Sequence, residues 1–413
     1  MIVETDAGGD PDDEQSLVRF LLYVNEWDVE GIIGTRERAR DGENLNTERT
    51  GMGIIRRQLK AYGECYSHLI QHDPRYPTEG QLQKRTVAGF GGDAGVKLIL
   101  NAVDAADPRP IWFLNWGTDH GSDGSSLKRA LDQVLKERGQ AGYAKFKQKL
   151  RLSSADKFEE HTTKLQPPFP IWVDTFRPEL ERRRWYHRFS GITATAGGFD
   201  VQRDLLTGHG PLGALYPLNT THPQKEGDTM TFLYLVPTGM NDPNEPTWGS
   251  WAGRYGRQEA FPNANYYWAN QADTWDGKTH RDQTLRRFAA DLQNDFRARL
   301  DWCVKSRAEA NHPPTVKITG PRHRTPKPGE FLRLDASGTS DPDNDRLTYE
   351  WWHYPEPGTY RGPLKIDQPN SSMLNVITPE VKEPCTLHII LTVRDHGSPP
   401  LTRYGRVVVT IEP

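Results

Sequence analysis

Apolar residues follow two alternating periods along the first three quarters of the chain. Short apolar runs at 1–3 and 27–34 are typical of buried strands. Steps of three and four residues between them predict a helix, one face of which carries Leu17, Phe20, Leu21 and Val24. Further strands are expected at 110–117, 149–154 and 169–174, and further helices at 47–62, 92–105 and 281–305. Strands that alternate with helices predict an α/β fold with an open, mostly parallel sheet and flanking helices.

The last quarter of the chain has a different pattern. Segment 308–314 ends in two prolines, interrupts the helical period and marks a linker. Short alternating segments separated by turns follow it, at 315–318, 331–334, 347–352, 386–393 and 406–411. Such segments predict a C-terminal all-β sandwich. We therefore expect two domains, residues 1–310 and residues 311–413.

Charge and cysteine content exclude several classes of protein. The formal net charge is -3 with both signs interspersed, so we expect no nucleic acid partner. No apolar run approaches the roughly 18 residues of a membrane span, so we expect no membrane partner. Cys65, Cys303 and Cys385 lack the spacing of a metal site. No secretory signal is present, and we interpret the abrupt start as that of a secreted or periplasmic protein whose leader was removed, although a cytosolic protein would look the same.

The turn between the first strand and the first helix is the strongest candidate site. It places Asp6, Asp10, Asp12 and Asp13 within eight residues. In a parallel sheet this turn lies at the carboxyl ends of the strands, where ligands bind. Crowded carboxylates repel unless a proton or a cation neutralises them, and Ca²⁺ suits an irregular shell of oxygens better than Mg²⁺ does. The alternative is that these residues cap the turn and the helix, which explains one or two carboxylates but not four.

The same segment, Thr5-Asp-Ala-Gly-Gly-Asp-Pro-Asp-Asp13, resembles the aspartate-rich amino-terminal motif of the nucleoside hydrolase superfamily. It is similar to the form found in the bacterial subgroup usually described as cellulose-binding. The resemblance implies a calcium cofactor, a base at Asp6, which also binds the metal, and metal ligands at Asp12 and Asp13. Glu4 stands where the superfamily has its first aspartate, and we expect it to contact substrate. The spacing is two residues longer here, so Asp10 is an additional candidate metal ligand.

The resemblance extends to a later carboxylate pair, Glu226-Gly227-Asp228. Nucleoside hydrolases complete their calcium shell with a late aspartate, which implies a metal ligand at Asp228. Gly227 replaces the histidine that often acts on a purine leaving group, and this difference weakens the case for nucleoside chemistry. We expect Glu226 to contact substrate or to act as an acid.

Two histidine-containing loops supply further candidates. The loop after the strand at 110–117 carries Asp119, a predicted substrate contact, and His120, a predicted acid or sugar contact. Relatives of the cellulose-binding subgroup usually read Trp-Gly-Gly-Ala-Asn-Thr there, and this chain departs from that pattern. A second candidate catalytic residue, His209, lies between two glycines that free the backbone to present the imidazole in a cleft. Ordinary loop histidines are the alternative in both cases.

The aromatic segment at 242–255 resembles the subgroup's Gly-Gly-Trp-Gly-Gly-Arg-Tyr loop. Aromatic faces stack on sugar rings, so we expect Trp248, Trp251 and Tyr255 to bind substrate, with Arg254 bridging hydroxyls. Packing of the junction between the two domains is the alternative.

In the sandwich, segment 334–351 resembles the signature of polycystic-kidney-disease-type and related immunoglobulin-like modules. Asp341, Asp343 and Asp345 are candidate ligands for a second calcium, and a purely structural acidic turn is the alternative.

These features together favour a calcium-dependent glycoside hydrolase that acts on O-glycosidic bonds of oligo- or polysaccharides. We expect Asp6 to activate the attacking water, and His120, His209 and Glu226 are candidates for the acid. A noncatalytic carbohydrate-binding, or cellulose-binding, protein is the alternative, and a nucleoside or other N-glycoside hydrolase is the third. The expected partner is a carbohydrate substrate, and homo-oligomerisation stays open.

Overall fold

The computed structural model describes residues 1–9, 11–40, 48–117, 125–155, 165, 168–175, 185–218 and 224–413. Its first part is built on an eight-stranded sheet in the order β3-β2-β1-β4-β5-β6-β8-β7. The strands are β1 (Ile2–Thr5), β2 (Gly31–Gly34), β3 (Thr86–Ala88), β4 (Ile111–Asn115), β5 (Leu150–Ser154), β6 (Trp172–Asp174), β7 (Gly256–Arg257) and β8 (Tyr266–Trp268). Neighbouring strands are parallel except β7 and β8. The open, mostly parallel sheet expected from the sequence is confirmed.

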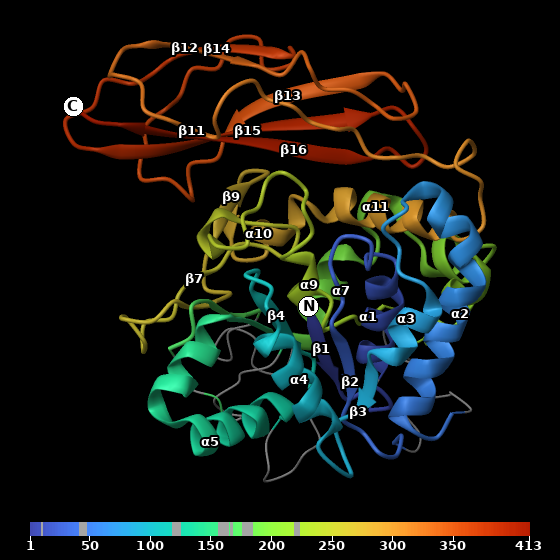
Figure 1. Ribbon diagram of the computed structural model, residues 1–413. Helices are drawn as coiled ribbons and strands as arrows, with labels where there is room; N and C mark the ends of the chain where they lie inside the picture. The colour runs from blue at the N-terminus through green and yellow to red at the C-terminus, as the bar shows by residue number, and fades with distance from the viewer. Residues whose placement is uncertain are drawn as a thin grey trace.

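The two faces of this sheet are covered by different helices because neighbouring residues of a strand point to opposite sides. Ile2 packs with α4 (Ala94–Asp104) and α5 (Ser126–Gln148), whereas Val3 packs with α1 (Pro11–Leu21), α2 (Gly51–His72) and α11 (Ala289–Asp301). Figure 1 shows α4 and α5 on one side of the sheet and α1 and α2 on the other. The buried strands therefore lie in the middle layer of a three-layer domain.

The remaining helices are shorter and fill the space around these layers. They are α3 (Glu79–Lys84), α7 (Trp185–Thr193), α8 (Gly210–Ala214), α9 (Met230–Leu233) and α10 (Gln283–Arg286), with short η2 (Ala196–Gly198), η3 (Gln202–Leu206) and η4 (Pro246–Trp248). None of the helices in the described ranges is both long and apolar enough to cross a lipid bilayer.

The C-terminal part consists of strands only. A four-stranded sheet has the order β11-β16-β15-β13, and β12 pairs with β14 in a second sheet. The strands are β11 (His323–Arg324), β12 (Phe331–Asp335), β13 (Leu347–His353), β14 (Met373–Ile377), β15 (Cys385–Asp395) and β16 (Thr402–Ile411). Side chains from both sheets share one core, in which Trp351 is buried. The expected sandwich is confirmed, while the domain boundary near residue 310 stays a prediction.

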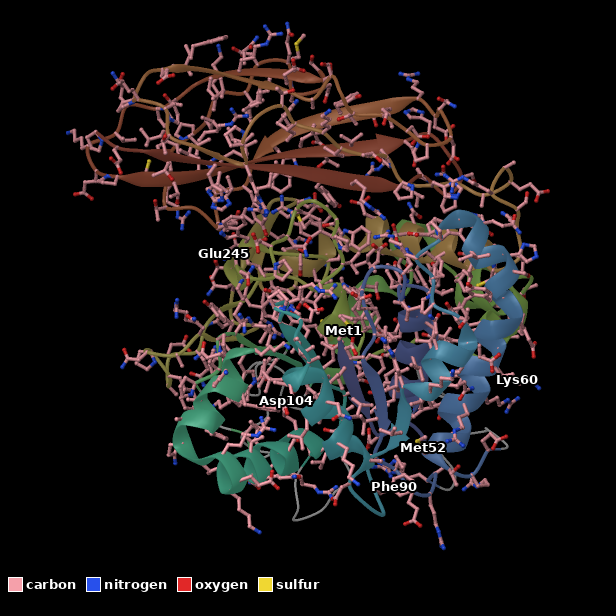
Figure 2. All side chains as sticks on the ribbon, viewed as in Figure 1. Met1, Met52, Lys60, Phe90, Asp104 and Glu245 are labelled. Atoms are coloured by element: carbon pink, nitrogen blue, oxygen red, sulfur yellow. The ribbon has the colours of Figure 1, made fainter. Side chains whose placement is uncertain are left out.

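The sandwich covers the end of the α/β domain at which β1 begins. A hairpin of β9 (Asp273–Trp275) and β10 (Lys278–His280), together with α10 and α11, lies between the two parts (Figure 1). Figure 2 shows Met1 nearer to the sandwich than Met52. Met52 packs beside Gly34, the last residue of β2. The carboxyl ends of β1 and β2 therefore lie at the end of the sheet away from the sandwich.

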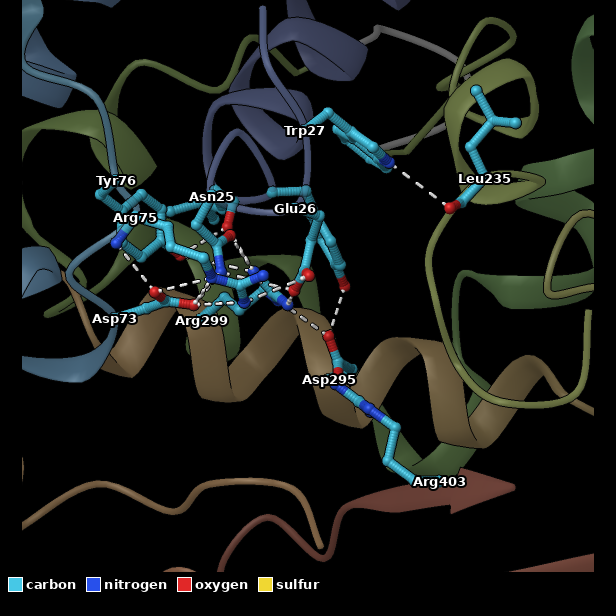
Figure 3. Close-up of polar contacts among 12 residues, drawn as sticks. Asn25, Glu26, Trp27, Asp73, Arg75, Tyr76, Leu235, Asp295, Arg299 and Arg403 are labelled. Atoms are coloured by element: carbon cyan, nitrogen blue, oxygen red, sulfur yellow. Dashed lines mark hydrogen bonds and ion pairs between the residues drawn. The ribbon is translucent and has the colours of Figure 1, made fainter. Parts of the chain in front are cut away.

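Buried ion pairs hold the two parts together. Asp295 on α11 bonds Arg403 of β16 at 2.7 Å and Arg299 of its own helix at 2.9 Å. Figure 3 shows how Arg299 extends this network to Asn25 and Glu26, which follow α1. The sandwich is thus anchored by charged contacts to the core helices of the α/β domain.

Candidate active site

The chain order places the candidate site where the strand order of the sheet reverses. β1 lies between β2 and β4, and ligands bind at such a switch point, beyond the carboxyl ends of the strands. Asp6 follows β1 directly, and Gly117 lies two residues beyond the end of β4. The two segments meet, because a Cβ added at Gly117 would lie 2.5 Å from Asp6 Oδ1. Gly117 therefore allows the close approach of Asp6 to the neighbouring strand end.

The turn after β1 bends sharply towards α1. The amide of Gly9 donates to the carbonyl of Asp6 at 3.1 Å, and Gly8 has φ of +95°, a conformation that favours glycine. The turn delivers Asp12 and Asp13 to the first turn of α1, where the helix dipole stabilises negative charge. Asp10 lies outside the described residues.

Asp12, Asp13 and Asp228 form one buried group, called here the acidic cluster. A carboxylate oxygen from each lies within 4.8 Å of one from each of the others, and the three residues are only 2–3% exposed. The hydroxyl of Thr5 donates to Asp13, and Lys225 Nζ lies 3.7 Å from Asp12. Buried charges of one sign require neutralisation, and an all-oxygen donor set suits a hard divalent cation. The side chains present therefore fit a metal ion.

The position of Asp228 is set by contacts with the sheet. Its carbonyl accepts hydrogen bonds from the amide of Thr231 at 3.0 Å and from the Thr231 hydroxyl at 2.7 Å. The same hydroxyl accepts from the indole of Trp116, which follows β4, at 2.7 Å. A residue more than two hundred positions from α1 is thereby held beside the first turn of that helix.

Asp6 lies at the edge of this site with a cationic partner. Its Oδ2 is 2.6 Å from Arg36 Nη2, and Arg36 Nε donates to the Asp6 carbonyl at 3.0 Å. Arg36 follows β2, so it comes from the neighbouring strand. Among the carboxylates that the structure describes, Asp6 is not part of the mutually close group. Its predicted roles as base and metal ligand stay predictions, and the pairing with Arg36 was not expected from the sequence.

Glu4 and Glu226 have structural partners. Glu4 is fully buried and accepts from the amide of Ser126 at 2.8 Å, so it caps the first turn of α5. Glu226 is fully buried with φ of +44°, and it bonds Arg19 Nε at 2.5 Å and Tyr216 at 2.8 Å. Burial, together with the Glu226 charge, raises the pKa of Tyr216 well above its usual range. These contacts argue for structural roles rather than the predicted substrate contacts.

The predicted histidines lie elsewhere or outside the described ranges. His209 precedes α8, and its Nδ1 is 3.5 Å from Asp301 at the end of α11. Within the described part of the chain, no contact joins His209 to the acidic cluster. Asp119 and His120 belong to segment 118–124, which is outside the described residues.

The predicted aromatic platform lies at the junction with the sandwich. Trp248 has its ring 5.1 Å from His388, and Arg403 lies over Trp251. Arg254 donates to Asp273 at 2.7 Å, and Tyr255 packs against Tyr234 in the core. Trp251 and Tyr255 are fully buried. This placement favours the alternative of junction packing over sugar stacking.

Arg36 and Lys225 are the charged residues of this site that were not singled out from the sequence. Arg36 carries a local signal, because it comes two residues after a buried strand whose carboxyl end borders β1. Lys225 lies in the same segment as Asp228, but nothing local indicates that its ammonium approaches Asp12.

Comparisons with known proteins identify the family of this chain. The profile of "Cellulose-binding Sde182, nucleoside hydrolase-like domain" matches residues 1–255, and that of "Cellulose-binding protein Sde0182, C-terminal domain" matches residues 331–411. No curated protein matches the chain.

One similar solved structure is a nucleoside hydrolase-related hypothetical protein from Saccharophagus degradans, described as associated with carbohydrate metabolism. It is 31% identical with a TM-score of 0.75, and the alignment covers 100% of this chain and 99% of that chain. The PKD domain from KIAA 1837 protein is 24% identical over 24% of this chain and 86% of its own, but its TM-score of 0.18 carries no argument. The resemblance noted in the sequence is confirmed, and the chain belongs to the cellulose-binding Sde182 family with a nucleoside hydrolase-like domain.

Proposed function

We propose that this protein is a calcium-dependent glycoside hydrolase that cleaves O-glycosidic bonds of oligo- or polysaccharides. The observation that carries the proposal is the acidic cluster, which Thr5 links to the carboxyl end of β1 at the switch point of the sheet, where Asp6 also lies. The description of the family as cellulose-binding and the link of the similar structure to carbohydrate metabolism support a carbohydrate substrate. The same description supports a location outside the cytoplasm.

Each described residue of the site would have a distinct task. Asp12, Asp13 and Asp228 would hold the calcium, with Asp10 as a further candidate ligand. Bound calcium would supply a positive charge that orients sugar hydroxyls and acidifies water. Lys225 would offset part of the cluster's negative charge through Asp12.

Proton transfer would fall to Asp6. Arg36 holds Asp6 Oδ2, so Oδ1, the oxygen nearer to Gly117, would accept the proton of the water that attacks the anomeric carbon. Arg36 would keep the carboxylate oriented during this step. We assign protonation of the leaving oxygen to His120, since Glu226 is engaged with Arg19 and His209 with Asp301.

Replacement of Asp6 by Asn tests this proposal, because the amide keeps the size of the side chain but cannot take the proton. Wild type and Asp6→Asn should be compared on cellulose and on other plant and microbial glycans, with Ca²⁺ present or chelated, by release of reducing sugar. Asp132→Asn on the exposed surface of α5 is the matched control. Release by wild type and by the control, with loss in Asp6→Asn and after chelation, would support the hydrolase.

A noncatalytic carbohydrate-binding protein is the second candidate. The ion pair of Asp6 with Arg36 favours it, because a guanidinium already occupies one oxygen of the proposed base. No reducing sugar from any glycan, with equal binding of wild type and Asp6→Asn to insoluble cellulose, would establish this function instead. Release of free base from inosine or uridine would indicate the N-glycoside hydrolase.

A further inference from the structure

The acidic turn of the sandwich brings three carboxylates together and, in the part of the chain that the structure describes, leaves one of their buried oxygens without a hydrogen bond. Asp341, Asp343 and Asp345 lie between β12 and β13, and an oxygen of each is within 4.8 Å of the others. Asp341 Oδ1 accepts from the amides of Asp343 at 2.9 Å and Asp345 at 3.0 Å. Its Oδ2 is buried and has no hydrogen-bond partner among the described residues. Backbone amides therefore satisfy one oxygen of Asp341, whereas the other oxygen has no donor within the described ranges.

A fourth carboxylate, from a different strand, lies beside this turn. Asp395 ends β15 opposite Leu347, which follows Asp345 by two residues. Asp395 is only 1% exposed. Its Oδ1 accepts from the amides of Leu401 at 2.9 Å and Gly397 at 3.0 Å.

The second oxygen of Asp395 is unsatisfied. Asp395 Oδ2 is buried and accepts no hydrogen bond within the described ranges. The charge of Asp341 acts on Asp395, so the two carboxylates lie near each other. A buried carboxylate oxygen without a partner is costly, and Asp341 Oδ2 is a second one. One unsatisfied oxygen belongs to the cluster itself and the other to Asp395 next to it, an arrangement that a bound cation would satisfy.

The linker between the two domains passes directly over this group. Asn311 Nδ2 donates to Asp395 Oδ1 at 3.1 Å, and the amide of His312 donates to Asp343 Oδ2 at 2.7 Å. The His312 ring also contacts His72 of α2, with 2.9 Å between the two ring nitrogens. A cation held by these carboxylates would therefore sit where the linker enters the sandwich and touches the α/β domain.

We propose that Asp341, Asp343, Asp345 and Asp395 bind a calcium ion that fixes the linker to the sandwich. The donors are carboxylate oxygens in an irregular arrangement, which suits Ca²⁺ and, because His312 already pairs with Asp343, offers little to Zn²⁺ or Ni²⁺. The turn is partly exposed, so water would complete the shell. The site is independent of the hydrolase proposal and of the acidic cluster at the other end of the α/β domain.

Calcium titration of the full chain tests the site. Isothermal calorimetry and the thermal midpoint with CaCl₂ or EDTA should be measured for wild type, Asp345→Asn and Asp341→Asn. Asp12→Asn disables the other acidic group, and Asp367→Asn is an exposed control in the same domain. We expect Asp345→Asn and Asp341→Asn to weaken one calcium-binding event by more than about tenfold and to remove its stabilisation. The Asp12→Asn and Asp367→Asn variants should retain that event.

A second measurement covers the case in which a variant does not fold. Tb³⁺ bound to the wild-type turn should be sensitised by Trp302, whose ring stacks on His312 with 5.2 Å between centroids, and Ca²⁺ should displace it. If Asp345→Asn and Asp341→Asn leave calcium binding and Tb³⁺ emission unchanged, the proposal is overturned and the turn is purely structural. The proposal would also be overturned if Asp12→Asn abolished all calcium binding, because every binding event would then belong to the acidic cluster.

Discussion

The candidate site depends on side-chain contacts between the ends of neighbouring strands. Asp6 after β1, Arg36 after β2 and Gly117 after β4 come from three adjacent strands and meet at one edge. The local backbone is part of this arrangement, because Gly117 has φ of +135°, which a residue with a side chain rarely adopts. Small changes at these positions should therefore affect function more than stability.

Gly117→Ala provides a direct test at this scale. The added Cβ would lie 2.5 Å from Asp6 Oδ1, so the carboxylate must move. We expect the rate of glycan cleavage to fall on the order of a hundredfold, as displaced catalytic groups typically cause, and stability to fall by about 1–3 kcal/mol. Release of reducing sugar and urea unfolding would measure the two effects.

Gly91→Ala is the matched control for that variant. Gly91 also has a positive φ, +68°, but nothing lies within 4 Å of an added Cβ. It should lose about 1 kcal/mol of stability and keep its activity. Equal activity of the two variants would contradict the assigned role of Asp6.

A second prediction for single residues concerns the buried ion pair of Arg19 and Glu226. Both side chains are fully buried, so Glu226→Gln leaves a guanidinium without its charge partner. We expect the free energy of unfolding to fall by about 3–5 kcal/mol, measured by urea denaturation. Asp93→Asn, which removes a surface partner of Arg129, should cost less than about 1 kcal/mol. A loss at Glu226 as small as that at Asp93 would mean that its other hydrogen bonds, and not its charge, hold the site.

At the scale of elements, hydrophobic period predicted five strands of the large sheet but missed its strands β3, β7 and β8 and the long helix α5. The strands expected near the starts of β1, β2, β4, β5 and β6 are present, because each carries apolar residues that the sheet buries. The three-residue β3 and β8 and the two-residue β7 were not expected, since so short a strand is defined by its neighbours. The helix expected at 281–305 is divided into α10 and α11, although Leu285, Phe288 and Leu292 all face one core across the break.

The same limit applies to the candidate site. Asp12, Asp13 and Asp228 were singled out because the aspartate-rich motif and the later carboxylate pair can each be recognised in the sequence. The structure brings the three residues together. Arg36 and Lys225 were not singled out. Their contacts with Asp6 and Asp12 join segments that are far apart in sequence. For the aromatic segment at 248–255 the sequence left sugar stacking and junction packing both open, because tryptophan is common in both settings, and the observed contacts favour packing.

The start of α2 gives a prediction for an element. Thr50 caps this helix by accepting from the amide of Gly53 at 3.0 Å. The first residue of α2, Gly51, packs against the carbonyls of Ala7 and Arg36 and so supports the site. We expect Thr50→Ala to cost about 1 kcal/mol in thermal or urea unfolding, whereas Ser67→Ala in the interior of the same helix should be close to neutral. Equal costs would show that the cap does not hold this end of α2.

For the whole molecule, polar contacts at the junction join the two parts, and we expect them to unfold together. Asp291 on α11 accepts from Thr402 at 2.9 Å and from Tyr404 at 2.5 Å on β16, and Arg394 on β15 lies 2.9 Å away. Burial and the Asp291 charge raise the pKa of Tyr404 well above its usual range, so this phenol stays protonated and keeps donating. Because the contacts come from α11, a core helix of the first domain, loosening the sandwich should also loosen the α/β domain.

Acid should act on this junction through Asp295. Burial by itself raises the pKa of this carboxyl, but Arg403 and Arg299 outweigh it and lower the pKa of Asp295 to about 2, against 3.8 when unfolded. A carboxyl with a lowered pKa stabilises the fold above its unfolded pKa, and that stability is lost as the pH falls through 3.8 towards 2. The contribution linked to this proton is about 2 kcal/mol.

Urea unfolding of wild type and Asp295→Asn between pH 7 and pH 2.5 measures this contribution. The difference in the free energy of unfolding should be constant from pH 7 to about pH 5 and should shrink as the pH falls further, because protonation then removes from wild type what the substitution removes at every pH. Asp367→Asn, at an exposed carboxylate paired with an exposed lysine, should show no such dependence. A difference that stays constant down to pH 2.5 would mean that Asp295 holds the junction by hydrogen bonding, with Tyr23 donating to it at 2.8 Å, and not by its charge.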